Sequence, residues 1–299
     1  MTGFIAIRRT FGRIVSTLGG AVGTVIIVVV VGAAILAPLI VTHDPDALDI
    51  LNRFSGPSAA HWLGTDHLGR DLYSRLVFGA QVAMLVALIA ISSALVLGTL
   101  LGILAATLST RWERVILIVF DIISSFPSLV LALAVVAVFG PSTALVTAIV
   151  AVTLVPHFGR VARAQMLTLR NAPFMEAERL LGTSATRIVL SHVLPNIAGP
   201  LVVLASIDIP VVITIEAGLS FIGLGVRPPL ASWGTLIYDG YAYLSDSKIP
   251  VIVASAALAV ATLGFTLFGE ALRDAVDPRL DRGGDRKSTR LNSSHGKLT

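Results

Sequence analysis

Few ionisable side chains in this sequence could do chemistry, and several of them interrupt long apolar runs. Asp121, His157 and Asp208 lie within or at the end of separate runs. A charged group is costly to place in an apolar environment, so each suggests a function or an internal partner. Together they could form the acid/base set of an enzyme that works within a membrane, but their separation in different segments argues against it. Asp208 could instead face a cationic ligand or pair with an arginine.

Sequence motifs for phosphate binding and hydrolysis do not occur. There is no G-x-x-x-x-G-K-[ST] loop, so ATP cannot be bound by that route. No H-E-x-x-H, no G-x-S-x-G and no cluster with metal-ligand spacing is found. The chain has no cysteine, which excludes disulfides and thiolate metal sites. We therefore expect no catalytic residue, no cofactor and no metal on this chain.

The composition is that of a membrane protein. Hydrophobic residues make up 55% of the 299 residues and charged residues only 13%, with a mean hydropathy of +0.87. Soluble domains are about one quarter charged. Spanning a bilayer as a helix takes about 20 apolar residues, and six segments satisfy this length: Gly20 to Val41, Ala80 to Leu108, Val115 to Phe139, Thr143 to Met166, Ile197 to Ile215 and Ile249 to Phe268. Pro127 should kink the third of them.

The positive charges of the connections predict the orientation. Placing the N-terminus and the C-terminus in the cytoplasm puts most of the connecting arginines inside, as the positive-inside rule requires. The resulting organisation is a cytoplasmic segment over 1–19, a first span with an extracytoplasmic loop over 20–78, and a core of five spans over 79–280. A long cytoplasmic connection lies at 173–196.

The C-terminal tail, residues 285–299, differs in composition from the rest of the chain and carries much of its excess charge. Its polar sequence DRKSTRLNSSH, from Asp285 to His295, resembles the translation of a sequencing adapter. The alternative is a natural disordered basic tail. Without the tail the formal net charge falls from +4 to about +1. The basic isoelectric point, near 9.8, therefore gives no support for a nucleic-acid partner.

The cytoplasmic connection reads PFMEAERLLGTSATRIVLSHVLPN. A helical pattern around Glu176 to Leu181 is broken by Gly182, and a second helical run ends at Pro195. A short helix-turn-helix too polar to insert is the shape expected of an element that docks into a groove of a partner.

This connection resembles the EAA loop of ABC importer permeases. The matching residues are Glu176, Ala177, Gly182, Leu194 and Pro195, whereas Glu178 stands where a second alanine is usual. Three other segments resemble the second permease of dipeptide, oligopeptide and nickel importers: HWLGTDHLGRDLYSRLVFGAQ from His61, EAGLSFIGLGVRPPLASWGTLI from Glu216 and GEALRDAVDPRL from Gly269. The resemblance extends from about Gly20 to Leu280.

The resemblance implies a fold, a function and a set of partners. It implies an all-α integral membrane protein with the type I importer permease fold, in a bacterial or archaeal plasma membrane. The partners would be a sister permease, two ABC ATPases that bind ATP and magnesium, and an extracytoplasmic solute-binding protein. The transported solute would be a dipeptide, an oligopeptide or a nickel complex. The alternative is an ion-driven secondary transporter, which would show inverted repeats; none is seen in the sequence.

The resemblance also assigns candidate site residues. Coupling to the ATPases would use Glu176, Ala177, Glu178, Gly182, Thr183, Ser184, Leu194 and Pro195. A substrate pathway could include Asp208, Glu216 and Ser220, with Glu216 ending the fifth span at the outer interface. In the extracytoplasmic loop, helical spacing predicts that Asp66 pairs with Arg70 and Asp71 with Arg75.

Overall fold

The computed structural model describes residues 10–276, and within that range the chain is a bundle of helices without a β-strand. The elements in chain order are α2 (Leu18–Ile40), the short η1 (Ile50–Asn52), α3 (Leu72–Thr107), α4 (Thr110–Ser124), α5 (Ser128–Phe139), α6 (Thr143–Arg170), α7 (Pro173–Leu180), α8 (Ala185–Ile188), the π-helical η2 (Val189–Val193), α9 (Leu194–Phe221), α10 (Trp233–Ala242) and α11 (Ile249–Val276). The all-α fold class is confirmed. Part of the predicted core, 277–280, and the tail 285–299 lie outside the described residues.

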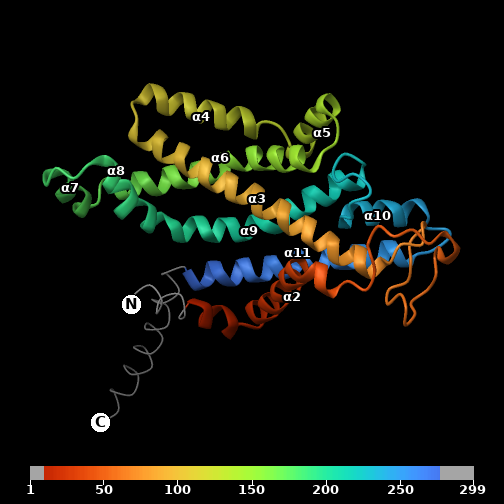
Figure 1. The fold of residues 1–299 in the computed structure, drawn as a ribbon. Helices are drawn as coiled ribbons and strands as arrows, with labels where there is room; N and C mark the ends of the chain where they lie inside the picture. Colours follow the sequence, from red (N-terminus) through yellow and green to blue (C-terminus); the bar gives the residue numbers. More distant parts are fainter. Residues whose placement is uncertain (1–9, 277–299) are drawn as a thin grey trace, which may run out of the picture.

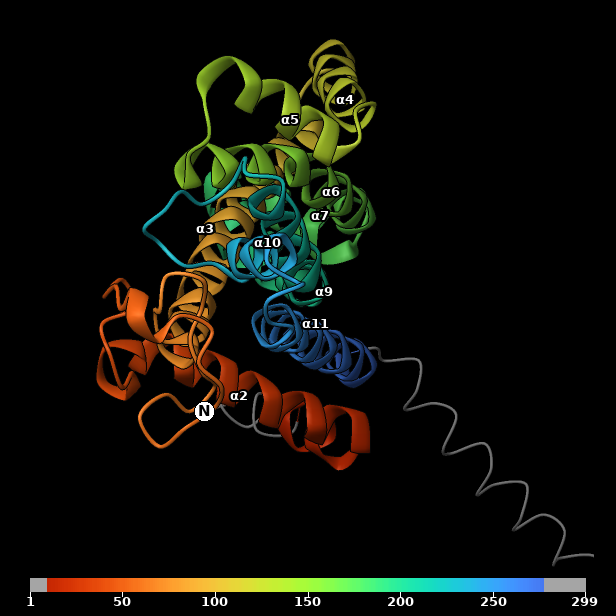
Figure 2. The same cartoon turned by 90° about the vertical axis from the view of Figure 1, so that its right-hand side faces the viewer.

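The long helices form a layered arrangement around α3, α6 and α9. These three lie side by side in the middle, α2 and α11 pack together on one flank, and α4 and α5 lie on the other (Figures 1 and 2). The connection 41–71 and α10 are at one end of the bundle, and α7 and α8 are at the opposite end (Figure 1). The bundle therefore has two polar ends separated by its apolar length.

Five helices of the described residues are long and apolar enough to cross a membrane: α2, α3, α6, the continuous run Ala185–Phe221, and α11. The third predicted span, Val115 to Phe139, is not one kinked helix. It is divided into α4 and α5, which meet at an angle of 83°. Pro127 caps the start of α5, and the steric clash of a proline with the preceding residue favours a helix end there. Helices α4 and α5 count as a sixth span only if the two of them together cross the membrane once.

A stripe of small residues brings α3 against α6. Ala90, Ala94, Gly98, Gly102 and Ala106 recur every four residues on α3 and are buried. A Cβ atom on Gly102 would collide with the carbonyl oxygen of Gly159 on α6, so the two backbones approach as closely as glycine allows. Small residues at this spacing are typical of helix pairs in membranes, where close packing replaces the hydrophobic effect.

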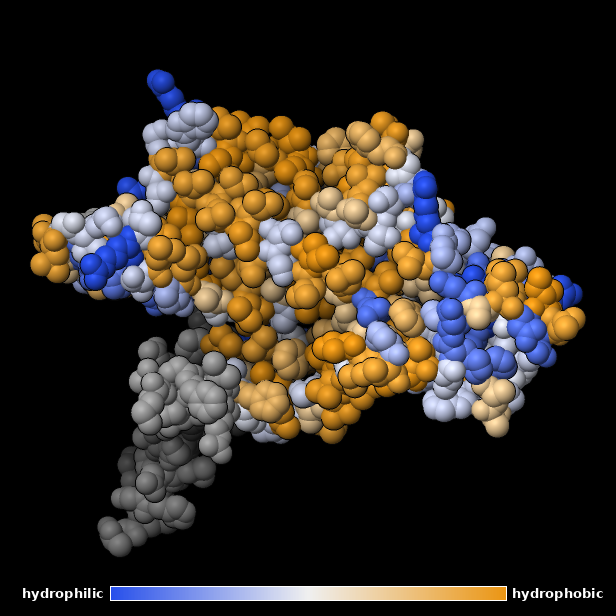
Figure 3. All heavy atoms as spheres, viewed as in Figure 1, coloured by the Kyte–Doolittle hydropathy of each residue, from blue (hydrophilic) through white to orange (hydrophobic). Residues whose placement is uncertain are grey.

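The surface has an apolar band between polar ends. Large apolar side chains on the helices are exposed to the surroundings, among them Val28, Leu88 and Val138. Figure 3 shows this orange band along the middle of the bundle, with hydrophilic residues gathered at the end that carries the connection 41–71. Exposed apolar surface on this scale suits acyl chains and not water. The chain is a multi-pass membrane protein.

Candidate functional site

The predicted coupling region, here called the EAA-like segment (173–196), folds as a helical hook at one end of the bundle. Helix α7 ends at Leu180, and Gly182 turns the chain with a φ of +72°. Only glycine adopts this conformation without strain, and an added Cβ at Gly182 would meet nothing within 4 Å. The predicted break at Gly182 is confirmed, and the turn lies in open space.

The tip of the hook exposes apolar side chains. Leu180 is 84% exposed and Leu181 is 80% exposed, whereas Met175 on the opposite side of α7 is 1% exposed and anchors the helix to the bundle. Other residues predicted for coupling are also at the surface: Glu176, Ala177 and Ser184 are exposed and Thr183 is half-buried. The structure thus brings the central residues predicted for coupling together on one accessible element.

Glu178, the departure from the EAA pattern, joins the two arms of the hook. Its carboxylate accepts a hydrogen bond from the Thr183 hydroxyl at 2.6 Å. It also lies 3.3 Å from Nε2 of His192 in η2. An alanine at this position could make neither contact. In this chain, the glutamate therefore supports the turn that the glycine makes possible.

The sequence predicted that the second arm of the hook ends at Pro195. In the structure the arm continues past this residue. Helix α8, η2 and α9 form one continuous helical run from Ala185 to Phe221. Pro195 lies in the first turn of α9, where a missing backbone N–H is tolerated, and the π-helical turn just before it accommodates the change of hydrogen-bond pattern. Leu194 and Pro195 therefore lie within the continuous helical run that joins the hook to a membrane-crossing helix, which also contains Pro200 and Pro210.

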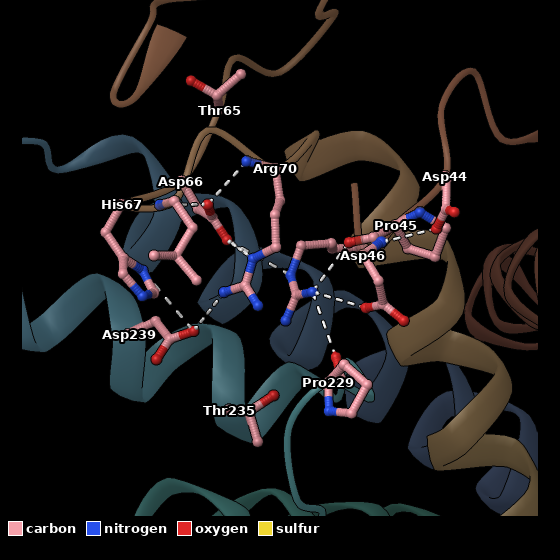
Figure 4. A network of polar contacts seen from close by, with 12 residues as sticks. Asp44, Pro45, Asp46, Thr65, Asp66, His67, Arg70, Pro229, Thr235 and Asp239 are labelled. Atoms are coloured by element: carbon pink, nitrogen blue, oxygen red, sulfur yellow. Dashed lines mark hydrogen bonds and ion pairs between the residues drawn. The ribbon is translucent and has the colours of Figure 1, made fainter. Parts of the chain in front are cut away.

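At the opposite end, charged residues form a second polar cluster, here called the loop network (Asp46, Asp66, Arg70, Arg75 and Asp239). The predicted Asp66–Arg70 pair is present, with Nε of Arg70 at 2.7 Å from Oδ2 of Asp66. Asp66 lies in a loop, where Oδ1 accepts the backbone N–H groups of Leu68 and Arg70 at 2.9 Å. Figure 4 shows Arg70 between Asp66 and Asp239, a residue of α10 at 3.3 Å.

The predicted pairing of Asp71 with Arg75 is wrong. Asp71 is the N-cap of α3 and accepts the backbone N–H of Ser74 at 2.8 Å. Arg75 is buried and turns elsewhere: its guanidinium lies 3.6 Å from Asp66 and 3.4 Å from Asp46, and it donates to the Pro45 carbonyl at 3.0 Å. The spacing misled because the helix begins only at Leu72, so Asp66 and Asp71 are not on a helical face.

Burial and hydrogen bonding set the charge states of two of these carboxyls in opposite directions. Burial raises the pKa of Asp71, but hydrogen bonds from Ser74 and His61 and the nearby His43 outweigh it, so its pKa lies below the ordinary value. Burial raises the pKa of Asp239, and the neighbouring His67, Arg70 and Arg75 only partly compensate. The surroundings of Asp71 stabilise its ionised form, whereas those of Asp239 make ionisation less favourable than in water.

Asp208 has a histidine partner within the chain. Its Oδ2 lies 3.1 Å from Nδ1 of His157 on α6, with the carboxylate buried and the imidazole half-exposed. Asp121 pairs elsewhere: Arg160, on α6, lies 2.9 Å from it on α4, and the neighbouring Arg163 pairs with Glu113 of α4. The three members of the hypothetical acid/base set are therefore divided between two separate ion pairs.

Glu216 does not end a span at an interface. Helix α9 continues to Phe221, and Glu216 is 1% exposed within it. Its Oε1 accepts the Ser220 hydroxyl at 2.7 Å, and Ser220 Oγ accepts the N–H of Val226 at 3.0 Å. The two residues fasten the chain after α9 to the helix end. In this conformation neither lines an open surface.

Sequence reasoning missed several residues that complete the polar end. Asp239 and Trp233 come from α10, in a region expected to be a loop, and Trp233 Nε1 donates to the carbonyl of Leu76 at 3.0 Å. His43 lies beside Asp71 and His61. The residues that Asp239, Trp233 and His43 contact are distant in the sequence, so the spacing of neighbouring residues did not indicate these contacts. The only sequence signal for the polar end was the set of aromatic and charged residues that follows the SFIGLG segment.

Comparisons with known proteins agree on one family. Residues 98–282 match the family described as the binding-protein-dependent transport system inner membrane component. The D,D-dipeptide transport permease DdpC of Escherichia coli K12 is 40% identical over 255 residues, covering 85% of this chain and 86% of the relative. The dipeptide permease DppC of Alkalihalophilus pseudofirmus is 35% identical over 273 residues, covering 91% and 90%.

A further relative and a solved structure extend the comparison. The glutathione permease GsiD of Escherichia coli O6:K15:H31 is 36% identical, covering 91% of this chain and 89% of the relative. The inward-facing MetNI methionine ABC transporter is similar in fold, with a TM-score of 0.56 at 17% identity, covering 68% of this chain and 96% of that one. The chain thus belongs to the family of inner membrane components of binding-protein-dependent transport systems, as an ABC importer permease.

Proposed function

We propose that this permease passes small peptides across the membrane and takes its motion from separate ATPases that bind the EAA-like segment. The observation that carries the proposal is the exposed hook at 173–193, with two leucines at its tip and a rigid connection into α9. Two such apolar side chains on a polar element suit the groove of a partner protein. The orientation predicted from the arginines places this hook in the cytoplasm, where ATP is available.

The connection to α9 gives the hook a mechanical role. Since the helical run from Ala185 to Phe221 is continuous, a displacement of the hook is transmitted along the whole helix to Glu216 and Ser220 at its far end. Alternating access needs such a rigid element between two arrangements. A sister permease would complete the pathway, and a solute-binding protein would dock on the end that carries the loop network.

The relatives favour a peptide as the solute. The names of the similar permeases specify a D,D-dipeptide, a dipeptide and glutathione, which are all short and carry an ammonium and carboxylates. The partly exposed His157–Asp208 pair lies on α6 and α9 and is the best placed of the candidate residues for contact with such a charged group. Nickel complexes are the second candidate from the sequence resemblance.

The test is peptide-stimulated ATPase activity of the complete complex. The chain would be co-reconstituted in proteoliposomes with the sister permease, the ATPases and the binding protein encoded beside it. Two substitutions at one position form a graded pair: Gly182→Asn keeps a residue that tolerates a positive φ, whereas Gly182→Trp adds both backbone strain and bulk at a turn where the chain itself has open space. We expect Gly182→Asn to retain most activity and Gly182→Trp to lose it while still inserting.

Charge reversal at the hook gives an independent variant. Glu176→Lys should also uncouple peptide uptake from ATP hydrolysis, because Glu176 is exposed on α7 and its loss leaves the bundle intact. Wild-type uptake in both Gly182→Trp and Glu176→Lys would refute the coupling role. Peptide uptake driven by an ion gradient without any ATPase would instead favour the secondary transporter.

A further inference from the structure

Three potential metal ligands meet at the start of α3, outside the loop network. His43 follows α2, His61 lies in the connection, and Asp71 caps α3; one donor atom of each lies within 4.8 Å of the others. Nδ1 of His61 is 3.0 Å from Oδ1 of Asp71, and Nδ1 of His43 is 3.9 Å from the same oxygen. The imidazole rings stack with centroids 4.6 Å apart. Three separate segments thus converge on one carboxylate oxygen.

The Asp71 carboxylate is fixed in place by its other oxygen. Oδ2 accepts the backbone N–H of Ser74 at 2.8 Å, the Ser74 hydroxyl at 2.7 Å and the Thr42 hydroxyl at 3.3 Å. These bonds leave Oδ1 directed at the two imidazoles. The side chain is fully buried, so it cannot turn away into solvent. A carboxylate oriented in this way by neighbouring donors is the arrangement that supports a metal ligand.

We propose that His43, His61 and Asp71 bind a divalent transition metal of the zinc class. Zinc binds imidazole nitrogen and carboxylate oxygen at about 2.0–2.2 Å in a tetrahedral arrangement, so two donors to one ion lie about 3.3–3.6 Å apart. The His61 distance to Oδ1, 3.0 Å, is slightly shorter than this range and the His43 distance, 3.9 Å, is slightly longer, so small side-chain movements would bring both to it. Nδ1 of His43 lies 3.0 Å from the Thr42 hydroxyl, and metal binding would replace this contact. The His43 side chain is partly exposed, so its ring has room to move toward Oδ1.

The neighbouring cluster of Asp66, His67 and Asp239 has the same types of ligand and makes an internal comparison. Its donor atoms also lie within 4.8 Å of one another. There, however, Arg70 already contacts both carboxylates and Arg75 lies 3.6 Å from Asp66. Two guanidinium groups supply the positive charge and repel a cation. Around Asp71 the positions facing Oδ1 are imidazoles, which are neutral when they bind a metal.

An ion at this site would tie the end of α2 to the start of α3. The connection between them contains only the short η1 as regular structure, so a link from residue 43 through 61 to 71 restrains most of its length. Binding to the folded chain and not to the unfolded chain stabilises the fold by mass action. The site is therefore a structural clip, independent of whether the transported solute is a peptide.

The experiment is zinc binding by the untagged full-length chain in lipid nanodiscs, measured by competition with a chromophoric chelator. We expect one zinc per chain, with His43→Gln and His61→Gln each weakening affinity by about tenfold or more. His67→Gln is the matched control and should leave affinity unchanged. Cobalt in place of zinc should give visible absorption bands that the His43→Gln variant lacks. The thermal unfolding midpoint should rise with zinc in the wild type and in His67→Gln, and not in the His43→Gln, His61→Gln double variant.

Two results would overturn the site. One is wild-type zinc affinity no greater than that of the His43→Gln, His61→Gln double variant. The other is an equal loss of affinity in His67→Gln, which would place the ion in the arginine-filled cluster. Because His43 is partly exposed, its substitution should leave the fold intact, so loss of binding reports on the ligand itself.

Discussion

The two polar ends of this bundle differ in which side chains they bury and which they expose. At the end that carries the loop network, Arg70 and Arg75 are buried. Arg70 contacts two carboxylates of the same chain, and Arg75 contacts carboxylates and the Pro45 carbonyl. At the end that carries the EAA-like segment, Leu180 and Leu181 project from the tip of α7 and are mostly exposed. Buried charges need internal partners, whereas exposed leucines gain stability only when another protein covers them.

This contrast indicates which end depends on partners for its structure. Both arginines of the loop network have carboxylate partners within the chain, so the network should hold its conformation in the isolated subunit. The hook has few internal restraints, mainly the Met175 anchor and the Glu178 contacts with Thr183 and His192. Its exposed apolar tip is the expected property of a surface whose partner is absent.

Breaking the loop network should have the largest effect on stability. Asp66→Ala removes the main carboxylate of Arg70 and one carboxylate of Arg75, leaving buried guanidinium groups poorly paired. Losing one partner of a buried ion pair costs about 3–5 kcal/mol. Unfolding of the detergent-solubilised chain by sodium dodecyl sulfate would measure this loss. Asp46→Ala is the control, since Asp46 is more exposed and its loss should cost under about 1 kcal/mol. Equal losses would contradict the central place of Asp66.

Loosening the hook should have an intermediate and local effect. Glu178→Ala restores the usual EAA pattern but deletes the contacts to Thr183 and His192, which are worth about 1 kcal/mol together. We expect faster amide hydrogen exchange over 173–193 and no change in the unfolding of the bundle. Glu176→Ala should leave exchange unchanged, because Glu176 is exposed on α7 two residues before Glu178. A global loss of stability in Glu178→Ala would mean that the hook is part of the core.

The smallest effect is expected from Asp239→Asn. Burial raises the pKa of Asp239 above its ordinary value of 3.8, so the native state binds this proton more tightly than the unfolded state. The wild type should therefore lose stability as pH rises from about 4 through the native pKa, and stay at the lower level above it. In Asp239→Asn that slope should decrease, with a change at pH 7 under about 1 kcal/mol. An unchanged slope would exclude Asp239 as its source.

The sequence predicted the elements that depend on local composition and length. Apolar runs of sufficient length placed all five long helices, and Gly182 marked a turn that requires a positive φ. The break at Pro127 was predicted only as a kink, because the 83° angle depends on how α4 and α5 pack against α6. Contacts between distant segments were not predictable: nothing near Arg70 indicates Asp239, and nothing in the spacing of Asp71 and Arg75 shows that Asp71 is a helix cap.

The most direct test of this account is amide hydrogen exchange of the chain in nanodiscs, with and without its ATPase partners. The account predicts strong new protection over 173–193 when the ATPases bind, and little change over 41–71, where exchange should already be slow. Protection that appears at 41–71, or no change over the EAA-like segment in an assembled complex, would contradict it.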